Sequence, residues 1–307
     1  MNDIAKLIYD NPQMIGVDIG FKDLKPIHGE WIREMVWGEG DYTLMAHRAA
    51  YKSSCLSVAI ALMMVLYPTQ NIIFLRKADN DVSEMIRMVT KILKSPIMAD
   101  LCAVLYGVEL KLTEEAQDHI STSLWTSPMG ASQLLGIGLK SSITGKHSEI
   151  VITDDICNVT DRISKAERDR TKLQYQELQN IRNRGGRIIN LGTKWHKDDV
   201  FPLMDNIHIY DYHRTGLISD EQLKKIKDSM TASLFACNIF TGNYHNFLSS
   251  LRKVSADKSY VFSFVFQASV RLYSRNYLEM VFTCLKGKNG GDASSSRKAR
   301  LCRRECT

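Results

Sequence analysis

The stretch that most constrains the fold runs from Met45 to Ser54 and leads into the apolar segment Cys55 to Tyr67. It places small residues, a lysine and hydroxyl side chains directly before a predicted helix. Backbone N–H groups of such a turn and the positive end of the helix dipole attract an anion. Lys52 would add a mobile positive charge, and Ser53 would offer a hydroxyl to a magnesium ion. The pattern therefore predicts a cradle for nucleotide phosphates.

The match to the general phosphate-loop pattern, G-x-x-x-x-G-K-[ST], is incomplete. Ala46 and Tyr51 occupy the two positions at which that pattern has glycine. The motif alone is equally compatible with a buried helix whose first turn carries a solvated lysine. Segments further along the chain must separate these two interpretations.

A second candidate segment is the apolar strand predicted at residues 149–155, which ends in Asp154 and Asp155. Carboxylates at the carboxyl edge of a parallel sheet can reach a metal ion and an attacking water molecule. We expect Asp154 to hold magnesium and Asp155 to polarise the water, although glutamate is more usual at the second position. The alternative is a buried strand that ends in a helix-capping acid.

Strand and helix patterns alternate through much of the chain. This alternation predicts an α/β fold, a P-loop NTPase with a mainly parallel central sheet flanked by helices. Residues 107–112 and 119–124 would add a hairpin or an edge extension. The predicted helices cover residues 22–38, 54–67, 79–95 and 160–184, and the predicted strands cover residues 42–46, 71–77, 133–139, 149–155 and 187–191.

The last predicted strand carries a third candidate segment. Gly185 and Gly186 are expected to stop the long, charged and mostly exposed helix before it, and the strand then delivers Gly192 and Thr193 to the same sheet edge. A Gly-Thr pair there lets backbone and hydroxyl approach a γ-phosphate closely. The sparse apolar contacts of the helix are expected at Ile163, Ala166, Leu173, Leu178 and Ile181.

Four stretches together resemble the large subunit of tailed-phage terminases, specifically its N-terminal DNA-packaging ATPase domain. The resemblance spans about residues 20–238, and its most specific part looks like the coupling motif of that family. Terminases are also known for phosphate loops that drop glycines and carry an extra arginine, here Arg48. The four stretches are residues 24–32, 48–53, 150–156 and 192–199, of which the last is the coupling motif.

The resemblance implies ATP and magnesium as ligands. By it, Asp154 is the metal-binding acid and Asp155 holds the position of the catalytic carboxylate. Arg48 would be a second catalytic residue, which stabilises charge on the transferring phosphoryl group. The expected nucleotide contacts are His47, Arg48, Lys52, Ser53, Ser54, Gly192 and Thr193, and the expected metal ligands are Ser53 and Asp154.

The resemblance also implies ATP hydrolysis coupled to the translocation of double-stranded viral DNA into an empty prohead. The expected partners are double-stranded DNA, the portal protein and the small terminase subunit, with a homo-oligomeric ring of this chain when engaged. DNA contacts would be mainly to phosphates. Such a virus- or prophage-encoded protein would work in the bacterial host cytoplasm, and the longest apolar stretch, residues 58–67, is far shorter than a membrane span.

Two other functions fit part of these observations. A helicase-type nucleic-acid ATPase would share the phosphate loop and the acidic strand, but it should also carry arginine-rich motifs in a second recombinase-like domain, and the sequence shows none. A non-hydrolysing remnant that binds only nucleotide or capsid partners is suggested by Tyr51, by Asp155 and by the lack of a nuclease pattern.

Charge and cysteine usage add little to these functions. The net charge is +6, and residues 286–307 hold seven basic against two acidic residues, so the rest of the chain is near neutral. A basic tail gives only slight support to nucleic-acid binding. The seven cysteines are scattered and form no C-x-x-C pair, so neither a disulfide framework nor a zinc site is indicated.

The predicted organisation is an ATPase core at residues 1–215, a helical linker at 216–238 and an unassigned tail at 239–307. A complete terminase continues into a nuclease that holds two metals with a cluster of acids, whereas acids are scarce in the tail. The nuclease domain is therefore expected to be absent or degenerate. We expect the tail to be a frameshift product or disordered, with a divergent small domain as the alternative.

Overall fold

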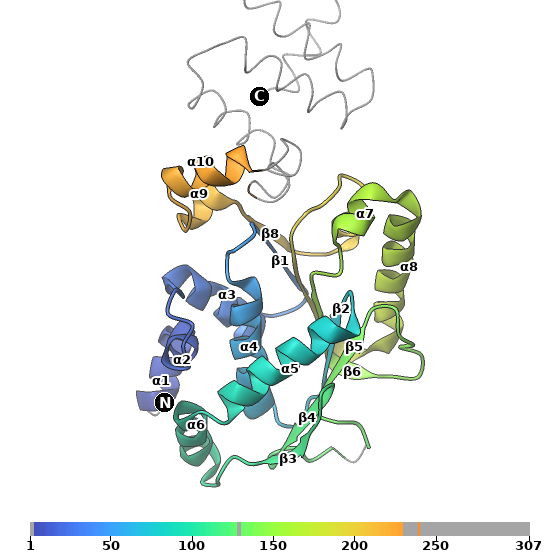
Figure 1. Ribbon diagram of the computed structural model, residues 1–307. Helices are drawn as coiled ribbons and strands as arrows, with labels where there is room; N and C mark the ends of the chain where they lie inside the picture. The colour runs from blue at the N-terminus through green and yellow to red at the C-terminus, as the bar shows by residue number, and fades with distance from the viewer. Residues whose placement is uncertain (1–2, 128–129, 230–238, 240–307) are drawn as a thin grey trace, which may run out of the picture. The chain divides into compact units, whose positions relative to one another are not determined.

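A central sheet of eight strands organises the computed structural model, which describes residues 3–127, 130–229 and 239. The strands follow the order β3-β4-β5-β2-β6-β7-β1-β8 across the sheet (Figure 1). Their bounds are β1 Tyr42–Ala46, β2 Ile72–Arg76, β3 Leu112–Glu115, β4 His119–Thr122, β5 Leu134–Gly138, β6 Ser148–Asp154, β7 Arg182–Gly192 and β8 Ile207–Tyr210.

Six neighbouring strands, from β5 to β8 in this order, are parallel, and β3 and β4 add an antiparallel edge. Parallel pairing brings the carboxyl ends of strands to one edge of the sheet. The loop after β1, the last residue of β2, the acids that end β6 and the Gly-Thr pair that ends β7 therefore meet there, although they are distant in sequence.

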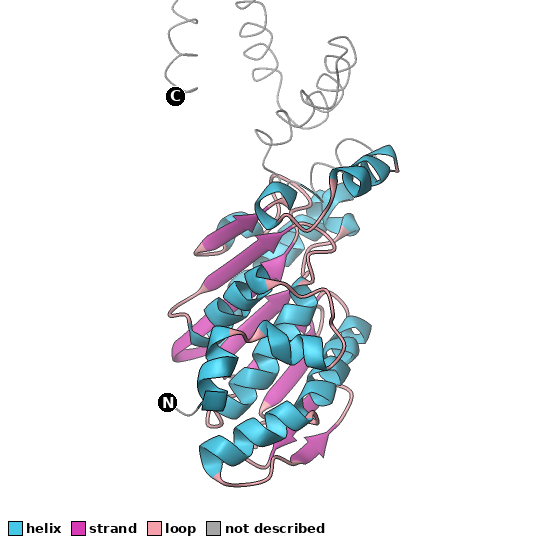
Figure 2. Cartoon of the chain, turned by 90° about the vertical axis from the view of Figure 1, so that its left-hand side faces the viewer, coloured by secondary structure: helices cyan, strands magenta, loops and turns pink. Residues whose placement is uncertain are grey.

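Helices cover both faces of this sheet. The first six lie on one face and α7 and α8 on the other (Figure 1). Figure 2 views the first of these faces, with helices in front of the strands. The bounds are α1 Asp3–Asp10, α2 Gln13–Asp18, α3 Pro26–Trp37, α4 Lys52–Leu66, α5 Asp79–Leu93, α6 Pro96–Tyr106, α7 Val159–Ile163, α8 Lys165–Ile181, α9 Tyr212–Thr215 and α10 Asp220–Asp228.

Alternation along the strands divides the core between the two faces. In β2, Ile72 and Phe74 belong to the cluster that holds α3, α4 and α5, whereas Ile73 and Leu75 belong to the cluster that holds α8. Strands with both faces covered are apolar throughout, as expected for a parallel sheet between two helical layers. Helix α4 is buried nearly all round, which matches its almost uninterrupted apolar sequence.

The predicted α/β fold with a mainly parallel sheet and flanking helices is confirmed. The strand predicted at residues 42–46 has those bounds, those predicted at 71–77 and 133–139 are one residue shorter at each end, and the one predicted at 149–155 is shifted by one residue. The strand predicted at 187–191 is longer, since β7 begins at Arg182. The predicted edge extension also exists, as the antiparallel pair β3 and β4. Its first strand begins at Leu112, because α6 runs to Tyr106 and Gly107 ends that helix in the left-handed conformation.

The single helix predicted at residues 160–184 is wrong in two respects. It is divided into α7 and α8 at Ser164, which adopts an extended conformation and whose hydroxyl accepts a hydrogen bond from the Glu167 backbone N–H. It also ends at Ile181, before the two glycines that were expected to stop it. Gly185 and Gly186 lie within β7, where a Cβ on Gly186 would approach the Glu149 carbonyl oxygen closely.

The buried face of α8 also differs from the expected one. Ile163, the last residue of α7, and Leu173 of α8 are 79% and 64% exposed, and Ala166 is exposed as well, so these three do not contact the core. The buried positions of α8 keep two of the expected residues, Leu178 and Ile181, and add a polar and an aromatic side chain, because this helix packs through a hydrogen-bonded network as well as through apolar contacts. They are Thr171, Tyr175, Leu178 and Ile181.

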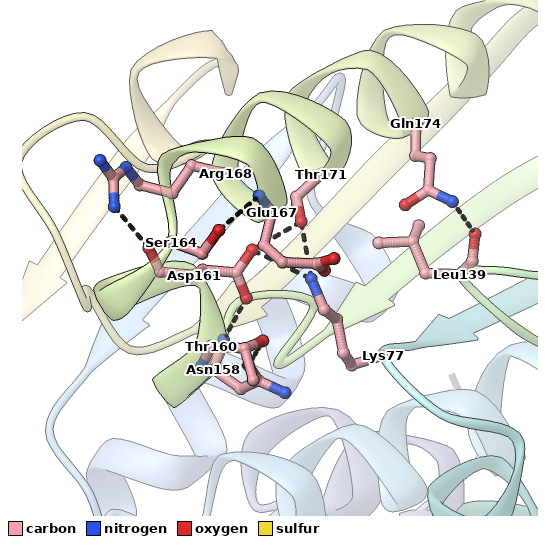
Figure 3. A network of polar contacts seen from close by, with 10 residues as sticks. All are labelled: Lys77, Leu139, Asn158, Thr160, Asp161, Ser164, Glu167, Arg168, Thr171 and Gln174. Carbon is pink, nitrogen blue, oxygen red and sulfur yellow. Dashed lines mark hydrogen bonds and ion pairs between the residues drawn. The ribbon is translucent and has the colours of Figure 1, made fainter.

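A buried polar network fixes α7 and α8 to the end of β2 (Figure 3). The ammonium of Lys77 lies 3.0 Å from Asp161 Oδ1 and 2.6 Å from Thr171 Oγ1, and Asp161 is fully buried. The other carboxylate oxygen of Asp161 accepts from the Asn158 backbone N–H, and the Thr171 hydroxyl donates to Oδ1. Each buried charge is therefore paired, which is the condition under which such groups are tolerated in a core.

The structure describes only part of the predicted linker at residues 216–238 and of the predicted tail at 239–307. Helix α10 lies within the predicted linker at residues 216–238, while residues 230–238 and 240–307 fall outside the described part, and the expected frameshifted or disordered tail stays a prediction. In the part of the chain that the structure describes, no helix has the length and apolar character needed to cross a membrane.

The Lys77 network predicts a large stability loss when one partner is removed. Lys77→Met should lower the free energy of unfolding by about 3–5 kcal/mol, because Asp161 would keep a buried and unpaired charge. Urea unfolding of the variant and of Lys165→Met, which changes an exposed lysine at the start of α8, measures the difference. A Lys77→Met loss no larger than that of the control would contradict the network's role.

Candidate functional site

The carboxyl ends of three parallel strands, β1, β6 and β7, and the first turn of α4 surround a small hollow of about 270 Å³. Whole small-molecule ligands usually need about 300–1,000 Å³, so the hollow suits the phosphate part of a nucleotide better than a complete one. Its wall is formed by the loop after β1, the first turn of α4 and the ends of β6 and β7. The lining residues are Arg48, Ala49, Ala50, Tyr51, Lys52, Ser53, Ser54, Asp155 and Thr193.

The loop of residues 47–51 adopts a conformation that glycine usually provides. Ala49 and Tyr51 have φ of +60° and +55°, in the left-handed region that side chains disfavour. The Tyr51 hydroxyl donates to Asp23 Oδ2 at 2.9 Å, and its ring stands edge-on to His28 of α3 at 5.9 Å between centroids. These contacts hold Tyr51 in place, so the missing glycine does not prevent the loop from turning.

The first turn of α4 presents free backbone donors to the hollow. Tyr51 is the N-cap, and in the described part of the chain no side chain accepts a hydrogen bond from this helix end. The N–H groups of Lys52, Ser53 and Ser54 are thus those that an α-helix leaves unsatisfied. Together with the helix dipole they make this side of the hollow a place for an anion.

Lys52 is held in place rather than mobile, contrary to the expectation from sequence. Its ammonium donates to the carbonyl oxygens of Ala46 and His47, each at 3.1 Å, and to Thr193 Oγ1 at 3.2 Å. Burial lowers the pKa of Lys52, while the carboxylates of Asp155 and Asp154 oppose that shift. The side chain thereby joins β1 to β7 and places a positive charge at the floor of the hollow.

Ser53 and Asp154 form the contact expected of a metal-binding pair. The Ser53 hydroxyl donates to Asp154 Oδ2 at 2.9 Å, although the two residues lie 101 positions apart. Asp154 is fully buried, and its Oδ1 has no hydrogen-bond partner among the described residues. A buried carboxylate oxygen without a partner is costly unless a ligand supplies one.

This donor set fits magnesium. Mg²⁺ prefers hydroxyl and carboxylate oxygens and is usually held by one or two carboxylates that substrate phosphates complete. In the described residues, no group of three or more histidine, cysteine, aspartate or glutamate side chains is placed to hold a metal ion. Ser53 and Asp154 are therefore the residues that would hold the ion.

Asp155 follows Asp154 but faces the hollow. Its backbone has φ of +47° and its N–H donates to the Leu191 carbonyl at 3.1 Å, so the chain turns sharply where β6 ends. Asp155 is exposed to the hollow, yet many protein atoms lie around its carboxylate. The resulting loss of hydration raises the pKa of Asp155, and the adjacent negative charge of Asp154 raises it further. A raised carboxyl pKa favours proton acceptance nearer to neutral pH.

Gly192 and Thr193 reach the site as predicted, for reasons that the structure specifies. A Cβ on Gly192 would lie 2.8 Å from Phe201 Cζ and 3.6 Å from Asp155 Oδ1, so only glycine allows this close approach. The Thr193 hydroxyl accepts from Lys52 and lies 3.2 Å from the Ala46 carbonyl oxygen. Thr193 therefore lines the hollow while it orients Lys52.

The segment after Thr193 is a shaped turn. Buried Asp199 accepts hydrogen bonds from the backbone N–H groups of Trp195, His196 and Phe201. The guanidinium of Arg48 lies 4.6 Å from the centre of the Trp195 ring, a cation–π arrangement. The turn at residues 193–201 thus contacts the loop of residues 47–51 through Arg48, and its Thr193 contacts Lys52.

Of the remaining predicted residues, two line the hollow and one does not. Arg48 and Ser54 line the hollow with Lys52 and Ser53, but His47 lies behind the loop, fully buried. The His47 ring nitrogens contact the Arg48 carbonyl oxygen and Thr215 Oγ1, both at 2.7 Å, so its ring supports the loop from α9.

One site residue was not predicted from the sequence. Arg76, the last residue of β2, donates through Nε and Nη2 to Asp154 Oδ2 and through Nη2 to Ser53 Oγ. The signal that would have found it is the parallel register, because Leu75 pairs with Thr153 and Arg76 is therefore level with Asp154.

Comparisons with known proteins find similar solved structures only. The chain is similar to the large terminase of a thermophilic bacteriophage (10% identity, TM-score 0.42, 66% of this chain and 48% of that chain), the large terminase ATPase domain of Thermus phage P74-26 (9%, 0.47, 66% and 88%) and the HK97 bacteriophage large terminase (11%, 0.43, 70% and 50%). It spans about half the length of the first and the third of these proteins. No family model and no curated protein matches the sequence.

The buried His47 predicts an acid-sensitive contribution to stability. Burial, with a smaller effect of the Lys52 charge, lowers the pKa of His47 to about 4 from an ordinary value of 6.5. The unfolded chain therefore takes up this proton first, and stability that is present above pH 6.5 is lost as pH falls toward 4. We expect the loss from His47 to be on the order of 3 kcal/mol at pH 4, since one pKa unit is about 1.4 kcal/mol.

Urea unfolding at pH 7 and pH 4 measures this contribution. The decrease should be smaller in His47→Gln than in the wild-type protein, while His147→Gln, which changes an exposed histidine, should behave as wild type. Equal decreases in all three proteins would contradict a buried, neutral His47.

Proposed function

We propose that this chain binds ATP with magnesium at the hollow and hydrolyses it, as the motor subunit that packages double-stranded viral DNA into a prohead. The observation that carries the ATPase proposal is the Ser53–Asp154 hydrogen bond. It joins the hydroxyl after the phosphate-loop lysine to the acid at the end of another parallel strand, beside an uncapped helix N-terminus. Phosphates and a divalent ion need these groups together.

Binding would divide between backbone and side chains. The N–H groups of residues 52–54 and the Lys52 ammonium would contact phosphate oxygens, and Ser53 and Asp154 would hold magnesium. Bound magnesium would neutralise charge on the phosphates and polarise the phosphoryl group. The adenosine part would extend beyond the hollow, because the hollow is too small for a whole nucleotide.

Hydrolysis would use two residues of the wall. Asp155 would accept a proton from the attacking water at its carboxylate, a role that its raised pKa favours. Arg48 would leave the face of Trp195 to stabilise negative charge on the transferring phosphoryl group. The same movement would pass the nucleotide state to the turn at residues 193–201, which offers a route to coupling with translocation.

The proposed partners rest on the sequence resemblance to terminases. They are double-stranded DNA, contacted through its phosphates, the portal protein, the small terminase subunit and further copies of this chain in a ring, in the bacterial host cytoplasm. A protein that binds nucleotide without hydrolysis is the second candidate, and the shorter Asp155 in place of glutamate favours it. Steady-state ATP turnover with and without double-stranded DNA separates the two candidates.

Removal of the Lys52 charge should strongly weaken nucleotide binding. Lys52→Ala is expected to weaken ATP affinity at least about a hundredfold, because it removes a charge-assisted contact to phosphate and frees Thr193. Equilibrium titration with ATP and Mg²⁺ measures the affinity, and Lys224→Ala, which changes an exposed lysine of α10, is the control. Wild-type affinity in Lys52→Ala would refute the phosphate site.

Substitution of Asp154 and of Asp155 should have different effects, one on magnesium dependence and the other on turnover. Asp155→Asn is expected to keep ATP affinity within about threefold but to lower turnover by about a hundredfold or more, the contribution of a positioned base. Asp154→Asn should instead raise the Mg²⁺ concentration that half-saturates turnover. Wild-type turnover and magnesium dependence in both variants would show that the acids are only structural.

A further inference from the structure

The guanidinium of Arg76 forms hydrogen bonds with both residues that would hold magnesium, Ser53 and Asp154. Its Nε is 3.0 Å from Asp154 Oδ2, and its Nη2 contacts both Asp154 Oδ2 and Ser53 Oγ, the latter at 2.9 Å. The side chain of Arg76 is 11% exposed and that of Asp154 is fully buried. A positive charge of the protein itself therefore contacts both residues that would hold the ion.

The arrangement is incomplete for an ion pair that serves only stability. A buried pair is favourable when the remaining lone pairs are also satisfied, yet Asp154 Oδ1 has no partner among the described residues. Meanwhile Oδ2 accepts three hydrogen bonds, two from Arg76 and one from Ser53. Asp154 Oδ2 therefore accepts every hydrogen bond that this carboxylate makes among the described residues, and Asp154 Oδ1 accepts none.

A second set of acceptors for Arg76 lies on α5. Its Nη1 donates to the Asp81 carbonyl oxygen at 3.1 Å and lies 3.8 Å from Glu84 Oε2. The Glu84 carboxylate is 64% exposed and makes no closer ion pair in the described residues. Arg76 can therefore leave Asp154, remain anchored through Nη1 and keep an opposite charge beside it.

We propose that Arg76 is a positioning residue that holds Ser53 and Asp154 together in the metal-free protein and that must move toward Glu84 when a magnesium-bound nucleotide enters. A guanidinium that contacts both Ser53 and Asp154 would lie close to an Mg²⁺ ion held by the same two residues, and two positive charges at such a distance repel strongly in a buried site. Arg76 thus competes with magnesium and sets the concentration at which the metal binds. The inference rests on the proposed function, since it assumes magnesium-dependent nucleotide binding here.

The test is an equilibrium measurement that requires no turnover. Fluorescently labelled ADP is bound to the full chain, and MgCl₂ is titrated to find the half-saturating Mg²⁺ concentration for wild type, Arg76→Gln, Arg76→Lys and Arg87→Gln. Arg87 is an exposed arginine of α5 and provides the matched control. Binding of the same ADP in EDTA gives the metal-free affinity.

Competition predicts a lower magnesium requirement without Arg76. The half-saturating concentration should fall about tenfold or more in Arg76→Gln, since hydrogen bonds to a charged group no longer have to be broken, and by a smaller factor in Arg76→Lys. Metal-free ADP affinity and the Arg87→Gln control should stay within twofold of wild type. An unchanged or raised requirement in Arg76→Gln, or weaker metal-free binding, would overturn the proposal.

Glu84→Gln tests the same movement from the receiving side. It should raise the half-saturating Mg²⁺ concentration about twofold to threefold, a small factor because the Glu84 carboxylate is exposed and screened. This variant decides the question if Arg76→Gln does not fold, and an unchanged value would then overturn the proposal. Wild-type protein that does not bind ADP with Mg²⁺ would refute the proposed function itself, an outcome distinct from binding that is indifferent to Arg76.

Discussion

The parallel register of β1, β7, β6 and β2 is the constraint on which the rest of the site depends. Met45 pairs with Gly192, Asp154 with Leu191 and Leu75 with Thr153, so four strand ends are level at one edge of the sheet. A shift of one residue in any pair would turn the side chains of that strand to the other face. The Lys52–Thr193 and Ser53–Asp154 contacts both follow from this alignment.

Charge explains why the site is stable without a ligand. The hollow itself is lined by two cations, Arg48 and Lys52, and one carboxylate, that of Asp155, so positive charge is in excess there and suits a phosphate group. Arg76 lies beside the hollow, between Asp154 and Glu84. Most of this charge is held: Lys52 by carbonyl oxygens and Thr193, Arg76 by Asp154, and Arg48 by the Trp195 ring. A nucleotide with its metal would therefore exchange existing contacts rather than fill an unorganised cavity.

Local sequence was sufficient for much of the fold, and it named candidate residues that the structure brings together. Apolar runs bounded by turn residues identified most of the parallel strands, because strands buried on both faces have continuous apolar sequences. Lys52, Ser53 and Asp154 were predicted from the chemistry that phosphates and magnesium require. The edge strand β8 was missed because Ile207 and Ile209 are about 40% exposed and give no clear core pattern.

What could not be predicted depends on contacts between distant residues. Arg76 and Lys77 resemble the polar end of any strand, and only the register and the packing of α8 show that one faces Asp154 and the other faces Asp161. His47 belongs to the predicted phosphate loop, but its side chain is buried against α9 and does not line the hollow. The two glycines within β7 mislead because a helix stop and a strand irregularity use the same residue type.

The central claim is that one magnesium-bound nucleotide is held between the α4 N-terminus and the end of β6. A crystal structure of the chain with ADP and Mg²⁺ tests it most directly. The account predicts a β-phosphate on the N–H groups of residues 52–54, with the metal about 2.0–2.1 Å from the Ser53 hydroxyl oxygen and next to Asp154. Nucleotide bound at another place, or phosphates bound here with the metal distant from both Ser53 and Asp154, would contradict it.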